Sequence, residues 1–209
     1  SLVDPDVVAE MAPDEVIVAT GSMPRRDGFQ LATPITPVAG HDLPHVYSSW
    51  DIFGFGGRAE VRGPAVVFDD TGTFEAISVA DALLEAGAKV TMIGREESIG
   101  ANLPYPPATV EAARERLMSG DFDFIGGHYL QGITPEEVII GVPFTERVRP
   151  VPAGTVVLVG YNHPNRELPE YLASADGDTP WNVHLIGDVT GTNGIMPAIH
   201  QAAQVARAI

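Results

Sequence analysis

Residues 65–93 read AVVFDDTGTFEAISVADALLEAGAKVTMI, and this stretch decides the fold. Ala65–Phe68 is an apolar run of the kind that forms buried parallel strands. After the turn Asp69–Thr73, apolar residues recur at helical spacing from Phe74 onward, and Lys89–Ile93 predicts the next strand. A strand, a helix and a strand within about 30 residues form the repeating unit of doubly wound folds. We therefore predict an α/β protein with a Rossmann-like parallel sheet.

The residues that follow add further elements to this unit. A helix is expected at about 107–119, because apolar residues keep helical spacing there and Gly120 ends the pattern. Its core-facing residues are expected to be Val110, Ala113, Leu117 and Met118. Three short pieces predict a small antiparallel meander: Phe122–Ile125, Val138–Val142 and Thr145–Val148. Thr155–Gly160 then predicts another buried parallel strand.

The two ends of the chain carry a similar pattern. Glu15–Gly21 and Val183–Ile186 predict buried strands, and a helix is expected to open near Pro197. The expected buried stripe of that helix comprises Ile199, Ala202, Ala203, Ala206 and Ile209. Residues 22–46 are rich in Pro and Gly and predict an extended connection. The aromatic residues within 47–57 are expected to pack this connection onto the core, with a binding surface as the alternative.

Composition narrows the classes of function. The chain contains no cysteine, which excludes disulfides, thiolate catalysis and Fe–S ligation by its own residues. A net charge of −16 argues against a nucleic-acid partner, because a polyphosphate needs a basic surface. The sequence has neither an apolar run of the ~20 residues that a membrane helix needs nor a targeting segment, so the cytoplasm is expected. Histidines without ligand spacing and the lack of an acid–base pair predict no metal site and no catalytic residue.

The turn Asp69–Thr73 lies where a dinucleotide fold places its phosphate loop. In that loop a GxGxxG pattern lets backbone amides approach a pyrophosphate at the helix N-terminus. Asp70, Gly72 and Glu75 stand at the three glycine positions, so only Gly72 is kept. Acidic side chains would also repel the pyrophosphate. We expect that this turn has lost pyrophosphate binding, with a nucleotide held in a non-standard way as the alternative.

Arg95 follows the second strand of the unit. A dinucleotide fold often has a ribose-binding acid at this point. An arginine here could pair with a 2′-phosphate instead, and the alternative is an ordinary surface side chain.

A second candidate site lies near the end of the chain. Gly187 and Asp188 follow a predicted strand, and a glycine-containing loop leads to a helix start at Met196, Pro197 and Ala198. The carboxylate of Asp188 could accept hydrogen bonds from sugar or ribityl hydroxyls. The helix N-terminus could face an electron-rich ring oxygen. The alternative is an aspartate that caps its own turn.

Six segments, in this order, resemble the C-terminal region of the old-yellow-enzyme-like NADH:flavin oxidoreductases. That group includes trimethylamine and dimethylamine dehydrogenases and 2,4-dienoyl-CoA reductase. The segments are Glu15–Gly21 (EVIVATG) with Pro24 and Arg25; Trp50 with Asp51; Val66–Ala76; Ala86–Arg95; Thr155–Asn165; and His184–Asp188 with Ala198–His200 and Ala206–Ile209. The resemblance covers nearly the whole chain.

The resemblance implies an organisation and a set of cofactors. A TIM barrel with FMN and an Fe–S cluster would precede a FAD-like domain, into which an NAD(P)H-like domain is inserted. It implies that residues 1–61 form part of the FAD-like domain and a connection, that residues 62–160 form the inserted domain, and that residues 161–209 return to the FAD-like domain. Ala19, Thr20 and Gly21 would match a FAD-contact strand, Gly187 and Asp188 the ribityl or ribose contact, and Met196, Pro197 and Ala198 the helix start at the flavin ring.

The acidic turn at 69–75 is similar to the amine-dehydrogenase side of the group, where the FAD-like site holds ADP, and it disfavours NAD(P)H. We therefore expect the nucleotide-binding portion of a flavin-dependent oxidoreductase, with FAD or ADP as ligand and inactive alone. The alternative is a non-catalytic ADP-binding or scaffold module. Because the opening βαβ unit of the FAD-like domain is not among the matched segments, we also expect exposed apolar strands that pair with a second copy. The resemblance further implies the TIM-barrel domain as a partner.

Overall fold

The computed structural model describes residues 5–55, 57, 59–103, 106–174, 181–191 and 194–209. The chain forms two compact units. The larger is Pro24–Tyr161, and the smaller joins Ser1–Met23 to Asn162–Ile209. Residues 24–61, which the resemblance assigned to the FAD-like portion, lie within the larger unit.

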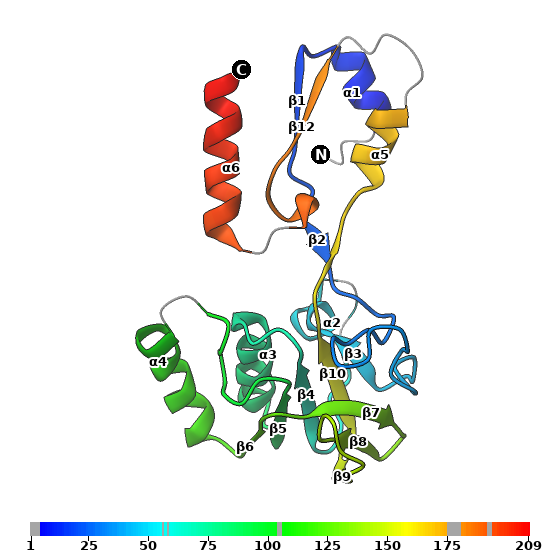
Figure 1. Cartoon of the computed structure of the whole chain (residues 1–209), viewed down its shortest axis with the longest axis vertical. Helices are drawn as coiled ribbons and strands as arrows, with labels where there is room; N and C mark the ends of the chain where they lie inside the picture. The colour runs from blue at the N-terminus through cyan, green and yellow to red at the C-terminus, as the bar shows by residue number, and fades with distance from the viewer. Residues whose placement is uncertain (1–4, 56, 58, 104–105, 175–180, 192–193) are drawn as a thin grey trace. The chain divides into compact units, whose positions relative to one another are not determined.

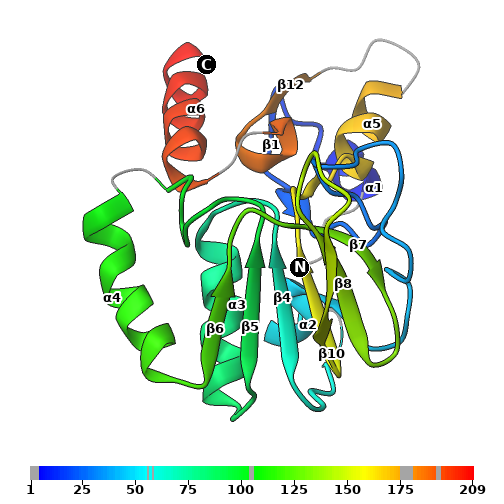
Figure 2. The same cartoon turned by 60° about the horizontal axis from the view of Figure 1, so that its bottom comes forward.

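A five-stranded parallel sheet forms the centre of the larger unit (Figure 2). Its order is β3-β10-β4-β5-β6. The strands are β3 (Val46–Ser48), β10 (Thr155–Val159), β4 (Ala65–Asp69), β5 (Val90–Gly94) and β6 (Phe122–Ile125). The predicted doubly wound α/β sheet is confirmed. The assignment of 122–125 to the meander was wrong, because the preceding helix crosses back over the sheet and delivers β6 parallel to β5.

Three helices belong to one side of this sheet: α2 (Ser49–Phe53), α3 (Phe74–Glu85) and α4 (Pro106–Ser119). Ala65 and Val67 of β4 alternate toward them and pack with the buried face of α3. Leu117 of α4 is fully buried in the same cluster. Met118 was predicted to be buried with Leu117, but it is 54% exposed because it lies one residue round the helix.

The antiparallel meander packs on the other face of the sheet. It consists of β7 (Tyr129–Ile133), β8 (Glu137–Gly141) and β9 (Val148–Pro152). Val66 and Phe68, the other alternate residues of β4, pack against its apolar side chains. A three-stranded antiparallel meander is confirmed, but two of its predicted pieces were wrong: β7 replaces 122–125 as the first strand, and the third strand begins at Val148 where 145–148 was predicted.

Residues 24–45, here called the connector, lead into β3 along an irregular path. Buried Gln30 bonds both backbone groups of Leu130, with Nε2 to O 2.6 Å and N to Oε1 3.0 Å. The Ile133 amide also donates to Ala39 O at 2.8 Å. The connector is thus fixed to β7 by hydrogen bonds that its Pro- and Gly-rich sequence does not reveal.

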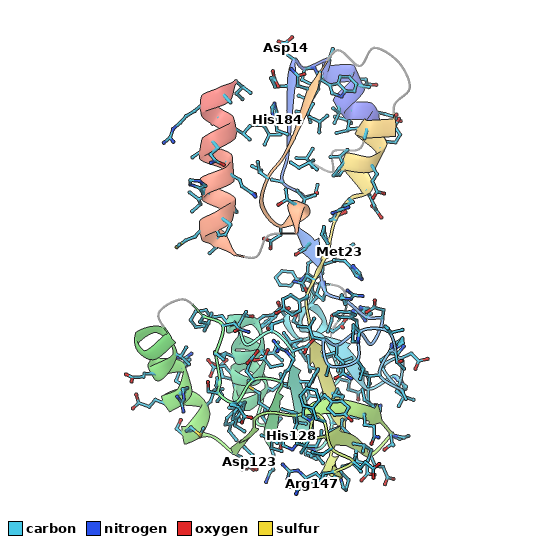
Figure 3. The ribbon with its side chains drawn as sticks, in the orientation of Figure 1. Asp14, Met23, Asp123, His128, Arg147 and His184 are labelled. Carbon is cyan, nitrogen blue, oxygen red and sulfur yellow. The ribbon has the colours of Figure 1, made fainter. Side chains whose placement is uncertain are left out.

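Two parallel strands, β1 (Glu15–Val18) and β12 (Asn182–Leu185), form the sheet of the smaller unit (Figure 1). Glu15 joins them, because its carboxylate accepts from Asn182 Nδ2 at 2.9 Å and lies 2.7 Å from Nε2 of His184. These hydrogen bonds lower the pKa of Glu15, and the bond with Asn182 has the larger effect. Figure 3 labels His184 in the smaller unit.

The other elements of the smaller unit complete it only in part. Helices α1 (Pro5–Met11) and α5 (Glu167–Ser174) pack a small cluster around Val18. A short antiparallel pair joins β2 (Ser22–Met23) to β11 (His163–Pro164). The 3₁₀ turn η1 (Gly187–Thr190) and helix α6 (Ile195–Ala208) follow β12.

Apolar side chains of the smaller unit are more exposed than the sequence predicts. Ile17 of β1 is 45% exposed, and Leu185 of β12 is 41% exposed. Helix α6 buries none of its residues, and Ile199 is 63% exposed. The prediction of a buried helical stripe was therefore wrong. The prediction of buried strands holds only for Val18 of β1, and the expected apolar exposure is present. Parallel strands are normally covered on both faces, which this two-stranded sheet is not.

The aromatic residues within 47–57 were expected to be packed inward. Tyr47 meets this expectation and contacts the core. Phe53 and Phe55 are exposed instead, and Phe55 contacts Trp50 edge-to-face with ring centroids 6.1 Å apart. The capping box between Ser48 and Asp51 fixes the start of α2.

Candidate functional site

A hollow of about 300 Å³ lies in the smaller unit, at the carboxyl ends of its two strands. Its lining residues are Ala19, Gly21, Ile186, Gly187, Asp188, Gly194, Ile195 and Ala198. Small residues dominate this lining, so backbone atoms form much of its wall. The carboxyl ends of parallel strands are where open α/β folds bind ligands.

The electrostatics of this hollow suit a ligand with hydroxyl groups and an electron-rich part. Asp188 is half-buried, and no described residue donates a hydrogen bond to its carboxylate. The N-terminus of α6 lies beside it, and its N-cap residue, Gly194, has no side chain that could cap the helix. A helix N-terminus carries unpaired amides and a partial positive charge. Together they provide one strong acceptor and one group of donors.

Neighbouring side chains hold the walls of the hollow in place. Gln201, on α6, accepts a hydrogen bond of 2.7 Å from the Gly187 amide. The Thr190 hydroxyl donates to Gly187 O at 2.8 Å, which closes η1. On the opposite wall, the Thr20 hydroxyl donates to Asn165 O at 2.8 Å, and the Asn165 amide donates to Gly21 O at 2.8 Å.

The turn after β4 in the larger unit has a different character, because the carboxylate of Asp69 accepts hydrogen bonds from the backbone amides of the turn. Asp69 Oδ1 accepts from the Gly72 amide at 2.8 Å and from the Thr71 amide at 3.0 Å and hydroxyl at 2.9 Å. These amides are the kind that bind a pyrophosphate in a dinucleotide fold. Burial raises the pKa of Asp69, and these hydrogen bonds oppose that rise.

The loop after β5 closes over the same turn. Asn102 Nδ2 donates to Thr71 O at 2.8 Å, and its backbone amide donates to Gly72 O at 3.0 Å. Gly72 has a φ of +66°, and a Cβ there would meet Asn102 Nδ2 at 3.0 Å. Glycine is therefore needed here for packing as well as for backbone conformation.

Arg95 lies beside this turn and is engaged by acidic groups of the chain. Its Nε is 3.2 Å from Asp70 Oδ1, and its Nη2 is 2.7 Å from Glu96 Oε1. The guanidinium is thus shared between two carboxylates of the larger unit.

A second hollow, of about 240 Å³, lies in the larger unit and includes Arg25 and Arg26 in its lining. Arg25 pairs with Asp27 at 2.6 Å and stacks on Phe29. Arg26 pairs with Asp51. Both arginines are already paired with aspartates, so this hollow is a weaker candidate for an anion site than the hollow of the smaller unit. Among the described residues there is also no group of three or more side chains that could hold a metal ion.

No family model matches the chain. A protein described as "Probable N-methylproline demethylase", from Rhizobium meliloti (strain 1021), is 31% identical over 93 residues, which is 44% of this chain and 12% of that protein. A solved 6-hydroxypseudooxynicotine amine oxidase from Pseudomonas geniculata N1 matches with a TM-score of 0.86 and 30% identity, over 98% of this chain.

Two further structures share the fold. Histamine dehydrogenase from Rhizobium sp. 4-9 has a TM-score of 0.87 at 23% identity over 100% of this chain, and 2-naphthoyl-CoA reductase has 0.78 at 21% over 98%. The chain matches the C-terminal portion of old-yellow-enzyme-like oxidoreductases. The resemblance predicted from sequence is confirmed. The chain spans only 28–31% of the length of these three structures.

Half of the site residues predicted from the sequence lie together in the fold. Those that line the hollow of the smaller unit are Ala19, Gly21, Gly187, Asp188 and Ala198. Thr20, Met196 and Pro197 adjoin them in sequence, and Met196 is exposed. Gly72 and Arg95 belong to the larger unit, where residues of the chain occupy their donors.

Sequence reasoning missed four residues of the hollow or its walls. Ile186, Gly194 and Ile195 line it, and Gln201 fixes Gly187. Gln201 lies three residues after Ala198, one helical turn along α6. Helical periodicity could therefore have indicated that it faces the same wall.

No described helix has the length and apolarity required to cross a membrane.

Proposed function

We propose that the hollow of the smaller unit binds a nucleotide, either ADP or FAD. The observation that carries this proposal is the meeting of Asp188, small residues and the uncapped N-terminus of α6 around one hollow. The Asp188 carboxylate would accept hydrogen bonds from sugar hydroxyls, and the α6 amides would donate to an electron-rich oxygen. A flavin bound there would carry electrons, whereas ADP would serve as a structural ligand.

We propose that the larger unit does not bind NAD(P)H through its turn. A pyrophosphate would have to displace the Asp69 carboxylate from the Thr71 and Gly72 amides and would meet the neighbouring charge of Asp70. Arg95 would have to leave Asp70 and Glu96 to reach a 2′-phosphate.

We propose that the whole enzyme oxidises an amine and that a TIM-barrel domain with FMN and an Fe–S cluster is the partner of this portion. Two features support the amine. The acidic turn follows the amine-dehydrogenase pattern, and the names of the two solved structures with the higher TM-scores describe an amine oxidase and histamine dehydrogenase. The competing function is a scaffold role without a ligand. For the larger unit this role is favoured, because Asp69 already occupies the amides of its turn.

Calorimetric titration with ADP, FAD, NADH and NADPH tests the proposal. We expect ADP or FAD to bind and Asp188→Asn to weaken binding at least tenfold, because hydrogen bonds to charged groups contribute about 1.5–3 kcal/mol. Asp14→Asn is the matched control, since Asp14 is an exposed aspartate of the same unit outside the hollow. Lack of binding by ADP and FAD would leave the scaffold, and micromolar NAD(P)H binding would overturn the assignment of the turn.

We further propose that the exposed apolar residues of the smaller unit mediate association with a second copy. Ile17, Leu185 and Ile199 are large apolar side chains in contact with water, and β12 has one strand neighbour. Light scattering of the isolated chain tests this, with Ile199→Ser expected to shift the distribution toward monomer. A strict monomer at high concentration would contradict the proposal.

A further inference from the structure

The meander β7-β8-β9 has one face toward the five-stranded sheet and one face away from it (Figure 2). Ile140 of β8 points inward and is fully buried in the core shared with β4. Side chains alternate along a strand, so Ile139 and Gly141 point outward. Opposite residues of an antiparallel pair share a face, which adds their partners on β9, Pro150 and Val148. These residues define the outer face of the meander.

Between its two ends the outer face is aliphatic and aromatic. Val148 is 50% exposed, and Pro150 is also exposed. The ring of Tyr129 lies across Gly141, because a Cβ on Gly141 would meet that ring at 2.6 Å. An antiparallel sheet with one solvated face normally alternates apolar residues inward with polar residues outward. The outer face departs from this pattern and resembles a surface that is covered.

Phe144, in the turn between β8 and β9, is fully exposed and has a strained backbone. Its φ is +62°, and the Thr145 amide donates to Val142 O at 3.2 Å across the turn. With Pro143 before it, Phe144 occupies the third position of a type II turn, which favours glycine or asparagine. A bulky residue in the left-handed region is an outlier, and such strain concentrates at functional sites. Packing within the described chain does not offset this strain.

The two ends of the meander carry opposite charges. Arg147 and Arg149 are exposed at the end where β8 turns into β9. Glu136 and Glu137 lie at the other end, where the Thr134 amide donates to Glu137 O at 2.8 Å and closes the turn after β7. None of these four charged side chains forms an ion pair with another residue that the structure describes.

Prolines block the addition of a further strand to the edge of the meander. β9 is an edge strand, and the Ala153 amide donates to Glu136 O at 2.8 Å. Because ladder bonds use alternate residues, positions 150 and 152 face away from β8. Both are proline and have no amide hydrogen to offer another strand. Association at the meander would therefore be face to face, as in packed sheets.

We propose that the outer face, together with Phe144, is the contact between two copies of this chain related by a two-fold axis. A surface with one positive and one negative end complements a copy of itself, because a two-fold axis through its middle places each end over the opposite one. Arg147 of each copy would then lie over Glu137 of the other. Burial of Phe144 between the copies would offset the strain of its turn.

This contact belongs to the larger unit alone. It depends neither on the nucleotide proposed for the smaller unit nor on the apolar side chains exposed there. The copies share a net charge of −16, so they repel each other at low salt. At about 0.15 M salt the Debye length is about 8 Å, which screens this long-range repulsion more than it weakens charge pairs in contact. Association is therefore best measured at that salt concentration.

Sedimentation equilibrium of the full chain would measure the dissociation constant of the dimer. Phe144→Gly should raise this constant at least tenfold, because it removes the aromatic anchor of the contact. In dilute monomer it should raise the midpoint of thermal unfolding, because glycine adopts a φ of +62° without strain. Phe55→Gly, at another exposed phenylalanine of the larger unit, is the control and should leave the dissociation constant unchanged.

Two results of that measurement would overturn the proposal. One is a chain that stays monomeric at high concentration. The other is a dimer that Phe144→Gly leaves intact and Ile199→Ser dissociates, since the association would then belong to the smaller unit.

A charge exchange tests the two-fold placement. Arg147→Glu and Glu137→Arg should each raise the dissociation constant about tenfold, because the symmetric contact turns two attractions into two repulsions and one surface pair contributes up to about fivefold. An equimolar mixture of the two variants should regain the unmodified affinity, since each reversed charge then meets an opposite one. Arg114→Glu, on exposed α4, replaces Arg147→Glu in the control mixture and should not restore it. A first mixture that stays as weak as its components would overturn the placement.

Discussion

Gln30 Nε2 donates a 2.6 Å hydrogen bond to Leu130 O, and Gln30 Oε1 accepts one of 3.0 Å from the Leu130 amide. One buried side chain thus completes both backbone groups of a residue 100 positions away. This pairing fixes the connector to the meander at a point where water has no access.

Gln30→Ala should reduce the free energy of unfolding by about 2–4 kcal/mol, because it leaves two buried backbone groups without partners. Denaturant unfolding would measure the change. Gln131→Ala is the matched control on β7, where the side chain is exposed, and it should change stability by less than about 0.5 kcal/mol. Equal effects of the two variants would show that the Gln30 bonds contribute little.

Alanine substitutions at Gly40 and Gly54 would distinguish backbone strain from steric overlap. Both have left-handed φ values, +81° and +79°. A Cβ on Gly40 would overlap Ile133 O, whereas one on Gly54 would find its nearest atom 3.9 Å away. Thermal unfolding should show that Gly54→Ala costs about 1–2 kcal/mol and that Gly40→Ala costs about 1–3 kcal/mol more. A smaller loss for Gly40→Ala than for Gly54→Ala would count against the packing described for the connector.

Asp51 should make the larger unit sensitive to acid. Burial alone would raise the pKa of Asp51, but hydrogen bonds from Ser48 and Arg26 outweigh burial and lower it below 3.8. The stabilisation is therefore present above about pH 4 and is lost as the pH falls through the lowered value. In unfolding experiments from pH 6 to 2, Asp51→Asn should lose less stability on acidification than the unmodified chain. A steeper loss would contradict the assignment.

Two neighbouring leucines of α3 differ in burial. Leu83 is almost completely buried between the helix and the sheet, whereas Leu84 is partly exposed. Leu83→Ala should therefore cost about 2–5 kcal/mol in unfolding experiments, and Leu84→Ala clearly less. If the two losses were equal, the helix would have to be rotated relative to the orientation described here.

Local sequence patterns predicted most of the larger unit because the apolar residues of its strands and helices are buried in its core. The strand Ala65–Asp69 has apolar side chains on both faces and is covered on both faces. The error at Phe122–Ile125 has a clear cause: a short apolar strand does not show its direction, which the preceding helix determines. The hydrogen bonds of Gln30 could not be predicted, because they join residues that only the fold brings together.

The candidate site was predicted in part for a similar reason. Gly187 and Asp188 follow a strand, so local sequence placed them at a strand end. The contact of that end with Ala19 and Gly21 depends on the pairing of β1 with β12, and the resemblance rather than the residues suggested it. The occupation of the turn by Asp69 required the structure, since an acidic residue near a helix N-terminus can either repel a ligand or bind the helix itself.

The pairing of β1 with β12 also constrains the order of events during synthesis. Glu15 and its partner Asn182 are 167 residues apart, and the whole larger unit lies between them. At about 5–20 residues per second, a ribosome needs about 10–30 seconds to deliver the second strand after the first. Through that interval Val16 and Val18 have no strand to pair with, whereas the larger unit has all its residues once Tyr161 has been made. We therefore expect the nascent β1 segment to stay unpaired until β12 has been made.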